Sequence, residues 1–127
     1  MEKFYKMKGC DETVIERTET EIGKTLPDSY KEFLRQSNGG EYIRKEPNHK
    51  YVGFFCCEDI PLYNADFDVQ KYLTENIIAF ASGDNGYFFD YREPGEPKII
   101  CCSFGNLDIA EVQPEADTFE EFINGWL

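Results

Sequence analysis

"LPDSYKEFLRQSNGG", residues 26–40, is the stretch of the sequence that decides the fold. Pro27 stands where the first turn of a helix tolerates a proline, and Tyr30 and Leu34 follow at helical spacing. The Asn-Gly-Gly of residues 38–40 accepts the left-handed backbone conformation that often ends a helix. The stretch therefore predicts a complete short helix whose two ends are both specified.

A second helix is expected just before it, over residues 11–22. Its acidic residues lie near the amino-terminal end, where the helix dipole favours negative charge. Gly23 is a plausible stop for this helix. The stripe expected to face the core is formed by Val14, Ile15, Thr18 and Ile22.

Beyond residue 50 the apolar pattern changes from helical to strand-like. Asn85-Gly86 is a strong hairpin signal, and Pro94-Gly95 offers another turn. A short helix is expected near residues 66–73, with Val69, Tyr72 and Leu73 facing inward. The expected strands are residues 51–57, 77–81, 87–91 and 99–102, with a weaker one over 109–112.

The carboxyl-terminal residues 117–126 predict an amphipathic helix. Thr118 and Glu121 match a capping box, and Phe119, Phe122 and Trp126 recur on one face. Helices toward both ends with a run of strands between them indicate an α+β fold, in which an antiparallel β-meander packs against these helices. The length of 127 residues is that of a single domain spanning residues 1–127.

The charge is unevenly divided along the chain. Residues 1–50 hold ten acidic and ten basic side chains, whereas residues 51–127 hold fifteen acidic and three basic ones, so the second part carries the whole net charge of −12. Such a surface repels nucleic acid and anionic lipid and attracts basic partners. We therefore expect a basic protein partner, and neither nucleic acid nor membrane as a direct ligand.

The longest uninterrupted apolar run, residues 77–81, is far shorter than a membrane span, and the amino terminus has charged residues where a signal peptide is apolar. We therefore expect the protein to stay in the cytoplasm. Five cysteines, an odd number that includes two adjacent pairs, fit free thiols in a reducing compartment better than disulfides.

No motif for catalysis or metal binding stands out, and we expect no enzymatic activity, no cofactor and no metal site. The pairs Cys56-Cys57 and Cys101-Cys102 suggest zinc, but adjacent strand residues point to opposite faces, so core packing is the better interpretation. Residues 64–75 partly copy a calcium loop but have Val69 where the sharp turn needs glycine. His49, the one histidine, lies in a polar stretch typical of a surface loop.

Residues 19–42, "ETEIGKTLPDSYKEFLRQSNGGEY", resemble the amino-terminal signature of the SUKH superfamily, which includes the yeast cell-wall synthesis regulator and many bacterial immunity proteins. "NIIAFASGDNGYFFDY" and "DTFEEFINGWL" resemble its later strand-turn-strand segment and its closing Phe-rich helix, so the likeness covers nearly the whole chain. The residues that carry the opening signature are Leu26, Pro27, Tyr30, Phe33, Leu34, Asn38, Gly39 and Gly40.

The resemblance implies protein binding. Bacterial members of the superfamily are cytoplasmic immunity proteins that neutralise toxins, many of them nucleases, whose basic surfaces suit an acidic partner. The alternative is a regulatory or scaffold domain that binds cell-wall or signalling proteins, as the eukaryotic relatives do. The candidate contact residues, chosen for acidity near expected loops, are Glu41, Tyr42, Glu58, Asp59, Asp84, Asp90 and Glu93.

Overall fold

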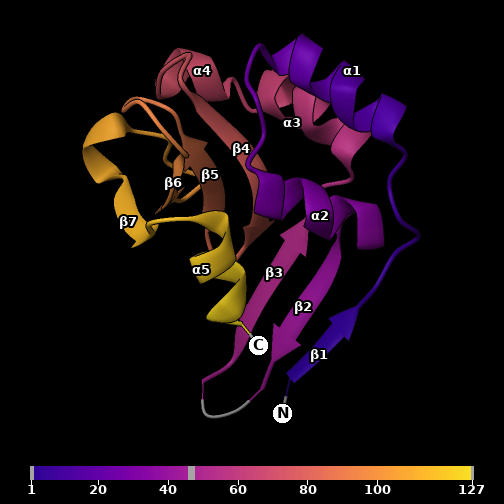
Figure 1. Ribbon diagram of the computed structural model, residues 1–127. Coiled ribbons are helices and arrows are strands. Elements are labelled where there is room, and N and C mark those ends of the chain that lie inside the picture. Colours follow the sequence, from indigo (N-terminus) through magenta and orange to yellow (C-terminus); the bar gives the residue numbers. More distant parts are fainter. Residues whose placement is uncertain (1, 46–47, 127) are drawn as a thin grey trace.

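A seven-stranded antiparallel sheet forms the centre of the structure, a computed structural model that describes residues 2–45 and 48–126. The strands follow one another across the sheet in chain order, although helices lie between β1 and β2 and between β3 and β4 along the chain (Figure 1). The strands are β1 (Glu2–Tyr5), β2 (Gly40–Arg44), β3 (Lys50–Phe54), β4 (Ile77–Gly83), β5 (Gly86–Asp90), β6 (Lys98–Cys102) and β7 (Gln113–Ala116).

The helices lie in two groups around this sheet. Helices α2 and α5 lie across one face of it, whereas α1 and α3 pack together beyond one end (Figure 1). The α-helices are α1 (Glu12–Ile22), α2 (Asp28–Gln36), α3 (Ile60–Asp66), α4 (Val69–Tyr72) and α5 (Phe119–Asn124). Two 3₁₀ turns are η1 (Cys57–Asp59) and η2 (Ile109–Glu111).

Aromatic rings fill the space between the covered sheet face and helices α2 and α5. Tyr30 of α2 is fully buried and lies 4.9 Å from the ring centres of both Phe89 and Phe119. Phe80 stacks on Phe89 at 4.1 Å. Edge-to-face and offset contacts of this kind favour one packing arrangement over others. The aromatic residues of α2 and α5 therefore fix how both helices lie on the sheet.

The Asn-Gly-Gly after α2 carries the chain from helix into strand. Gly39 and Gly40 have φ angles of 93° and 112°, in the region that favours glycine. A Cβ on Gly39 would also lie 2.7 Å from the carbonyl oxygen of Phe54. Asn38 secures the same corner, because its Oδ1 accepts a hydrogen bond of 2.7 Å from the N–H of Cys57. Both glycines and Asn38 are thus required by the connection to β2.

Side-chain amides replace a neighbouring strand along part of β4. Strand β3 pairs with β4 only opposite Ala81 to Gly83. Nearer the start of β4, the buried amide of Asn64 donates to the carbonyl of Ala79 at 2.9 Å and accepts from its N–H at 2.8 Å. Gln70 donates to the carbonyl of Ile77 at 2.7 Å. Helices α3 and α4 therefore attach to the sheet through backbone groups that β3 leaves unpaired.

The α+β fold and the antiparallel meander are confirmed. Helix α2 follows Pro27 as predicted, and the helix predicted over residues 11–22 is present as α1, ended by left-handed Gly23 with a φ of 68°. The hairpin at Asn85-Gly86 joins β4 to β5. Thr118 accepts a hydrogen bond of 3.1 Å from the N–H of Glu121, which confirms the helix-capping interaction at the start of α5.

Several predicted elements need correction. Strand β3 ends at Phe54, because Cys57 begins the η1 turn. The strand predicted over residues 109–112 is instead the 3₁₀ turn η2 at Ile109–Glu111, and the strand β7 follows from Gln113. Tyr72, expected to face inward, is 52% exposed, although Val69 and Leu73 are buried. Strands β1 and β2 and helix α3 were not predicted.

Candidate functional site

The sheet has one covered face and one face with an open groove. On β2 and β3 the side chains of Tyr42 and Phe54 point toward the helices, where Tyr42 meets Trp126 and Phe54 meets Phe33. Because side chains alternate along a strand, Glu41 and Gly53, which face each other in the register, lie on the opposite face. In the orientation of Figure 1 this opposite face lies behind the sheet.

A groove of about 440 Å³ lies on this opposite face, and we call it the open-face groove. Its floor is formed by small residues of three adjacent strands, Gly40, Gly53 and Ser82. Tyr5 at the end of β1 and Met7 after it form one side. Asp59, Tyr63 and Phe67, which lie in and beside α3, form another. Small floor residues leave the backbone of the sheet within reach of a partner.

Aromatic rings form the wall on the α3 side. Tyr63 packs on Phe55 with ring centres 4.4 Å apart, and Phe67 packs on Phe104 at 4.6 Å. Tyr63 is nevertheless 36% exposed and Phe67 41% exposed. Each exposed ring is therefore held in place by a second ring while one side remains open to solvent.

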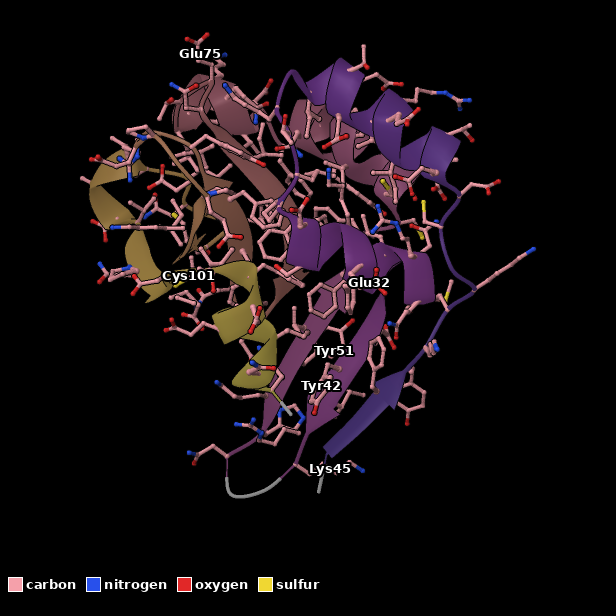
Figure 2. The ribbon with its side chains drawn as sticks, in the orientation of Figure 1. Glu32, Tyr42, Lys45, Tyr51, Glu75 and Cys101 are labelled. Carbon is pink, nitrogen blue, oxygen red and sulfur yellow. The ribbon has the colours of Figure 1, made fainter. Side chains whose placement is uncertain are left out.

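Two carboxylates line the same groove, Glu41 from β2 and Asp59 from the residue that precedes α3. Glu41 accepts a hydrogen bond of 3.0 Å from the hydroxyl of Tyr51, which Figure 2 labels on β3. Burial raises the pKa of the Tyr51 hydroxyl, and the hydrogen bond to Glu41 and its charge raise it further. Burial also raises the pKa of the Cys56 thiol, another lining residue, and the charges of Glu58 and Asp59 add to that shift. The carboxylates of Glu58 and Asp59 therefore make the electrostatic potential at Cys56 negative.

The structure brings two of the predicted contact residues together, and a third is the chain neighbour of one of them. Glu41 and Asp59 line the open-face groove, and Glu58 precedes Asp59 in the chain. Both oxygens of Glu58 accept hydrogen bonds from the amide of Asn38, at 2.9 and 3.2 Å. This amide holds the Glu58 carboxylate at the corner where α2 ends.

The other predicted contact residues lie elsewhere. Tyr42 is only 4% exposed and packs in the core, so its assignment to a contact surface is wrong. Asp84 lies in the β4–β5 turn, where it accepts from the N–H of Tyr51 at 3.1 Å. Asp90 is at the other end of β5 and pairs with Arg92 at 2.9 Å, and the exposed Glu93 follows it.

The acidic residues of the second part of the chain are not gathered on one face. Exposed carboxylates occur at η1, in the β4–β5 turn, in the β5–β6 connection and along α5. The structure therefore combines a locally acidic groove with a generally negative surface.

Sequence reasoning missed the exposed hydrophobic side chains of the groove, which are those of Tyr5, Met7, Tyr63 and Phe67. A signal for three of its lining residues was present. Asp59, Tyr63 and Phe67 follow one another at intervals of four, the spacing that puts side chains on one helical face. Without the prediction of α3 this spacing had no meaning.

Other chemistry finds little support in the described residues. Among residues 2–45 and 48–126, no group of three or more His, Cys, Asp and Glu side chains is placed to hold a metal ion. All five cysteines are free thiols, as predicted. No helix in the described part of the chain is long and apolar enough to cross a membrane.

A comparison with family models identifies the relationship. The model of the SMI1/KNR4 family (SUKH-1) matches residues 9–125. The chain belongs to the SMI1/KNR4 family. No curated protein matches the chain.

The range matched by the SMI1/KNR4 model contains the helices, strands β2 to β7 and most of the open-face groove. Tyr5 and Met7, together with strand β1, precede the matched range. Membership of the SMI1/KNR4 family supports a protein-binding domain, in toxin immunity or in regulation.

Proposed function

We propose that this chain is a non-enzymatic immunity protein that binds a cognate toxin domain of nuclease type and occludes its active site. The SMI1/KNR4 family membership supports the protein-binding part of this proposal. The toxin, its basic surface and its nuclease activity are the specific additions that we make to it.

The observation that carries the proposal is the open-face groove. Four large side chains around it are at least 36% exposed, namely Tyr5, Met7, Tyr63 and Phe67. A monomer gains nothing from holding such side chains in water, and contiguous apolar patches with a polar rim mark interaction sites. Aromatic anchors of this kind supply much of the binding energy of protein interfaces.

The charge of the chain supports a basic partner. The net charge is −12, and Glu41, Glu58 and Asp59 lie in or beside the groove. A nuclease domain needs positive charge to hold its nucleic-acid substrate, so a negative partner is attracted to the surface that it must cover. Occlusion of the active site then requires no catalysis by this chain.

Co-expression tests the proposal. The probe is the carboxyl-terminal domain of any secreted multidomain protein that the source genome encodes beside this gene, chosen for a basic net charge. We expect this chain to restore growth of cells that produce the toxin domain in the cytoplasm, and to co-purify with it. Failure to protect, or selective binding to a cell-wall or signalling protein, would favour a regulatory domain and overturn the proposal.

A further inference from the structure

The open-face groove combines aromatic rings with carboxylates, a combination suited to one kind of side chain. The rings of Tyr63 and Phe67 are each backed by a second ring, at 4.4 and 4.6 Å. A cation placed over the face of an aromatic ring is attracted by its quadrupole. The groove thus offers ring surface and negative charge to the same occupant.

The carboxylates that line the groove are available to such an occupant. Within the described residues, neither Glu41 nor Asp59 forms an ion pair, and Asp59 accepts no hydrogen bond through its side chain. Glu41 is held by the hydroxyl of Tyr51 through one oxygen, which leaves the other oxygen without a described donor. Lys6, the basic residue that lines the groove, is exposed and pairs with neither of them.

We propose that the open-face groove takes an arginine side chain of the protein partner, with its guanidinium over the rings of Tyr63 and Phe67 and hydrogen-bonded to the Asp59 and Glu41 carboxylates. This inference rests on the proposed function, because it assumes that a protein partner occupies the groove. Arginine fits better than lysine because its planar guanidinium stacks on aromatic rings and donates two parallel hydrogen bonds to a carboxylate.

The negative electrostatic potential in the groove favours a cationic side chain such as arginine. The charges of Glu58 and Asp59 both reach the thiol of Cys56, which lines the groove. The volume of about 440 Å³ exceeds what one side chain fills, so residues that flank the arginine also enter. Apolar flanking residues suit the exposed rings of Tyr5 and Tyr63 best.

A pair of peptides tests the inference without the natural partner. The probes are acetyl-Leu-Arg-Leu-amide and acetyl-Leu-citrulline-Leu-amide, which differ in charge but hardly in shape. Each is titrated to millimolar concentration against the labelled full chain, and amide shifts of Gly53 and Ser82 on the groove floor are followed by NMR. We expect the arginine peptide to shift these amides and to bind about tenfold tighter than the citrulline peptide.

Matched charge variants locate the effect. The double change Glu41→Gln with Asp59→Asn should remove the preference for arginine, and neither side chain caps a helix through a hydrogen bond in the fold. Glu96→Gln with Glu120→Gln alters the charge by the same amount, in the exposed β5–β6 connection and on α5 of the covered face, and should leave the preference intact. Equal shifts from both peptides, shifts away from the groove, or no shifts at all would overturn the inference.

The toxin domain separates this inference from the proposed function. If that domain binds the wild type and the Glu41→Gln/Asp59→Asn protein equally tightly, the arginine site is wrong while the immunity role stands. If the toxin domain binds neither protein, the immunity role fails, and the peptide titration alone decides the chemistry of the groove. A loss of affinity confined to the groove variant supports both.

Discussion

At the scale of single residues, Asn64 pairs with the part of β4 that β3 does not reach. Its amide satisfies both backbone groups of Ala79, which is fully buried, and also donates to the carbonyl of Ile60 at 2.8 Å. We expect Asn64→Ala to lower the free energy of unfolding by about 2–4 kcal/mol, because it leaves buried backbone groups without partners. Urea denaturation measures this change.

Asn124→Ala is the matched control for this change. Asn124 is exposed at the end of α5, so the substitution should alter the free energy of unfolding by less than about 0.5 kcal/mol. A cost below about 1 kcal/mol for Asn64→Ala would mean that water replaces the amide and that α3 is not attached to the sheet as described.

Tyr30 gives a prediction of the opposite sign. Its hydroxyl is fully buried and has no hydrogen-bond partner among the described residues. We expect Tyr30→Phe to leave the free energy of unfolding unchanged or to raise it by up to about 1 kcal/mol, since the ring contacts stay and an unpaired polar group disappears. Thermal and urea unfolding of the two proteins provide the comparison.

Tyr91→Phe serves as the counterpart to Tyr30→Phe. The Tyr91 hydroxyl donates to the carbonyl of Thr25 at 2.8 Å, so its removal should destabilise the fold by about 1 kcal/mol. If Tyr30→Phe proves as destabilising as Tyr91→Phe, the Tyr30 hydroxyl must have a partner such as a buried water, and its description as unpaired is wrong.

At the scale of secondary-structure elements, α5 is attached to the sheet by Trp126. The Trp126 side chain is 2% exposed, and its ring centre lies 5.4 Å from that of Tyr42. The Nζ of Lys50 lies 5.0 Å from the centre of the Trp126 ring. We expect Trp126→Ala to cost about 3–5 kcal/mol in the free energy of unfolding, measured with urea. A cost below about 1 kcal/mol would show that the last turn of the chain is frayed in solution.

Elements with marked ends are those that sequence reasoning predicted best. Helix α2 has Pro27 at its start, and α5 has the Thr118 cap, so local chemistry specifies these two starts. The end of α2 is less direct, because its C-cap is the extended Ser37 and the left-handed Gly39 follows two residues later. Strand β2 lacks such a pattern, because only Tyr42 of its five residues is buried and Glu41, on the opposite face, lines the groove. Residues 109–112 look apolar, yet Ile109 is 39% exposed in a 3₁₀ turn.

The candidate site was less predictable than the fold. Glu41 and Asp59 were selected for their acidity, but their meeting in one groove depends on the pairing of β2 with β3 and on where α3 lies. Such contacts join residues far apart in the chain, and no local pattern specifies them. The aromatic wall was missed because exposed aromatic side chains follow no core periodicity.

At the scale of the whole molecule, the net charge of −12 predicts how a partner is reached. We expect the affinity for the basic toxin domain to fall as salt rises from low to physiological concentration, because the attraction between exposed charges is screened. Isothermal titration calorimetry at several salt concentrations measures this dependence. A flat response would exclude charge as a contributor to recognition.

The central claim is that the chain acts by binding a protein with its open-face groove. The most direct measurement compares the affinity of the toxin domain for the wild type, for Tyr63→Ala with Phe67→Ala, and for Leu62→Ala. Leu62 lies beside Tyr63 on α3 and is 55% exposed, but it does not line the groove. We predict that the groove variant, confirmed as folded by circular dichroism, raises Kd by about 100-fold and that Leu62→Ala changes it by less than about threefold. An unchanged Kd in the folded groove variant would contradict the account.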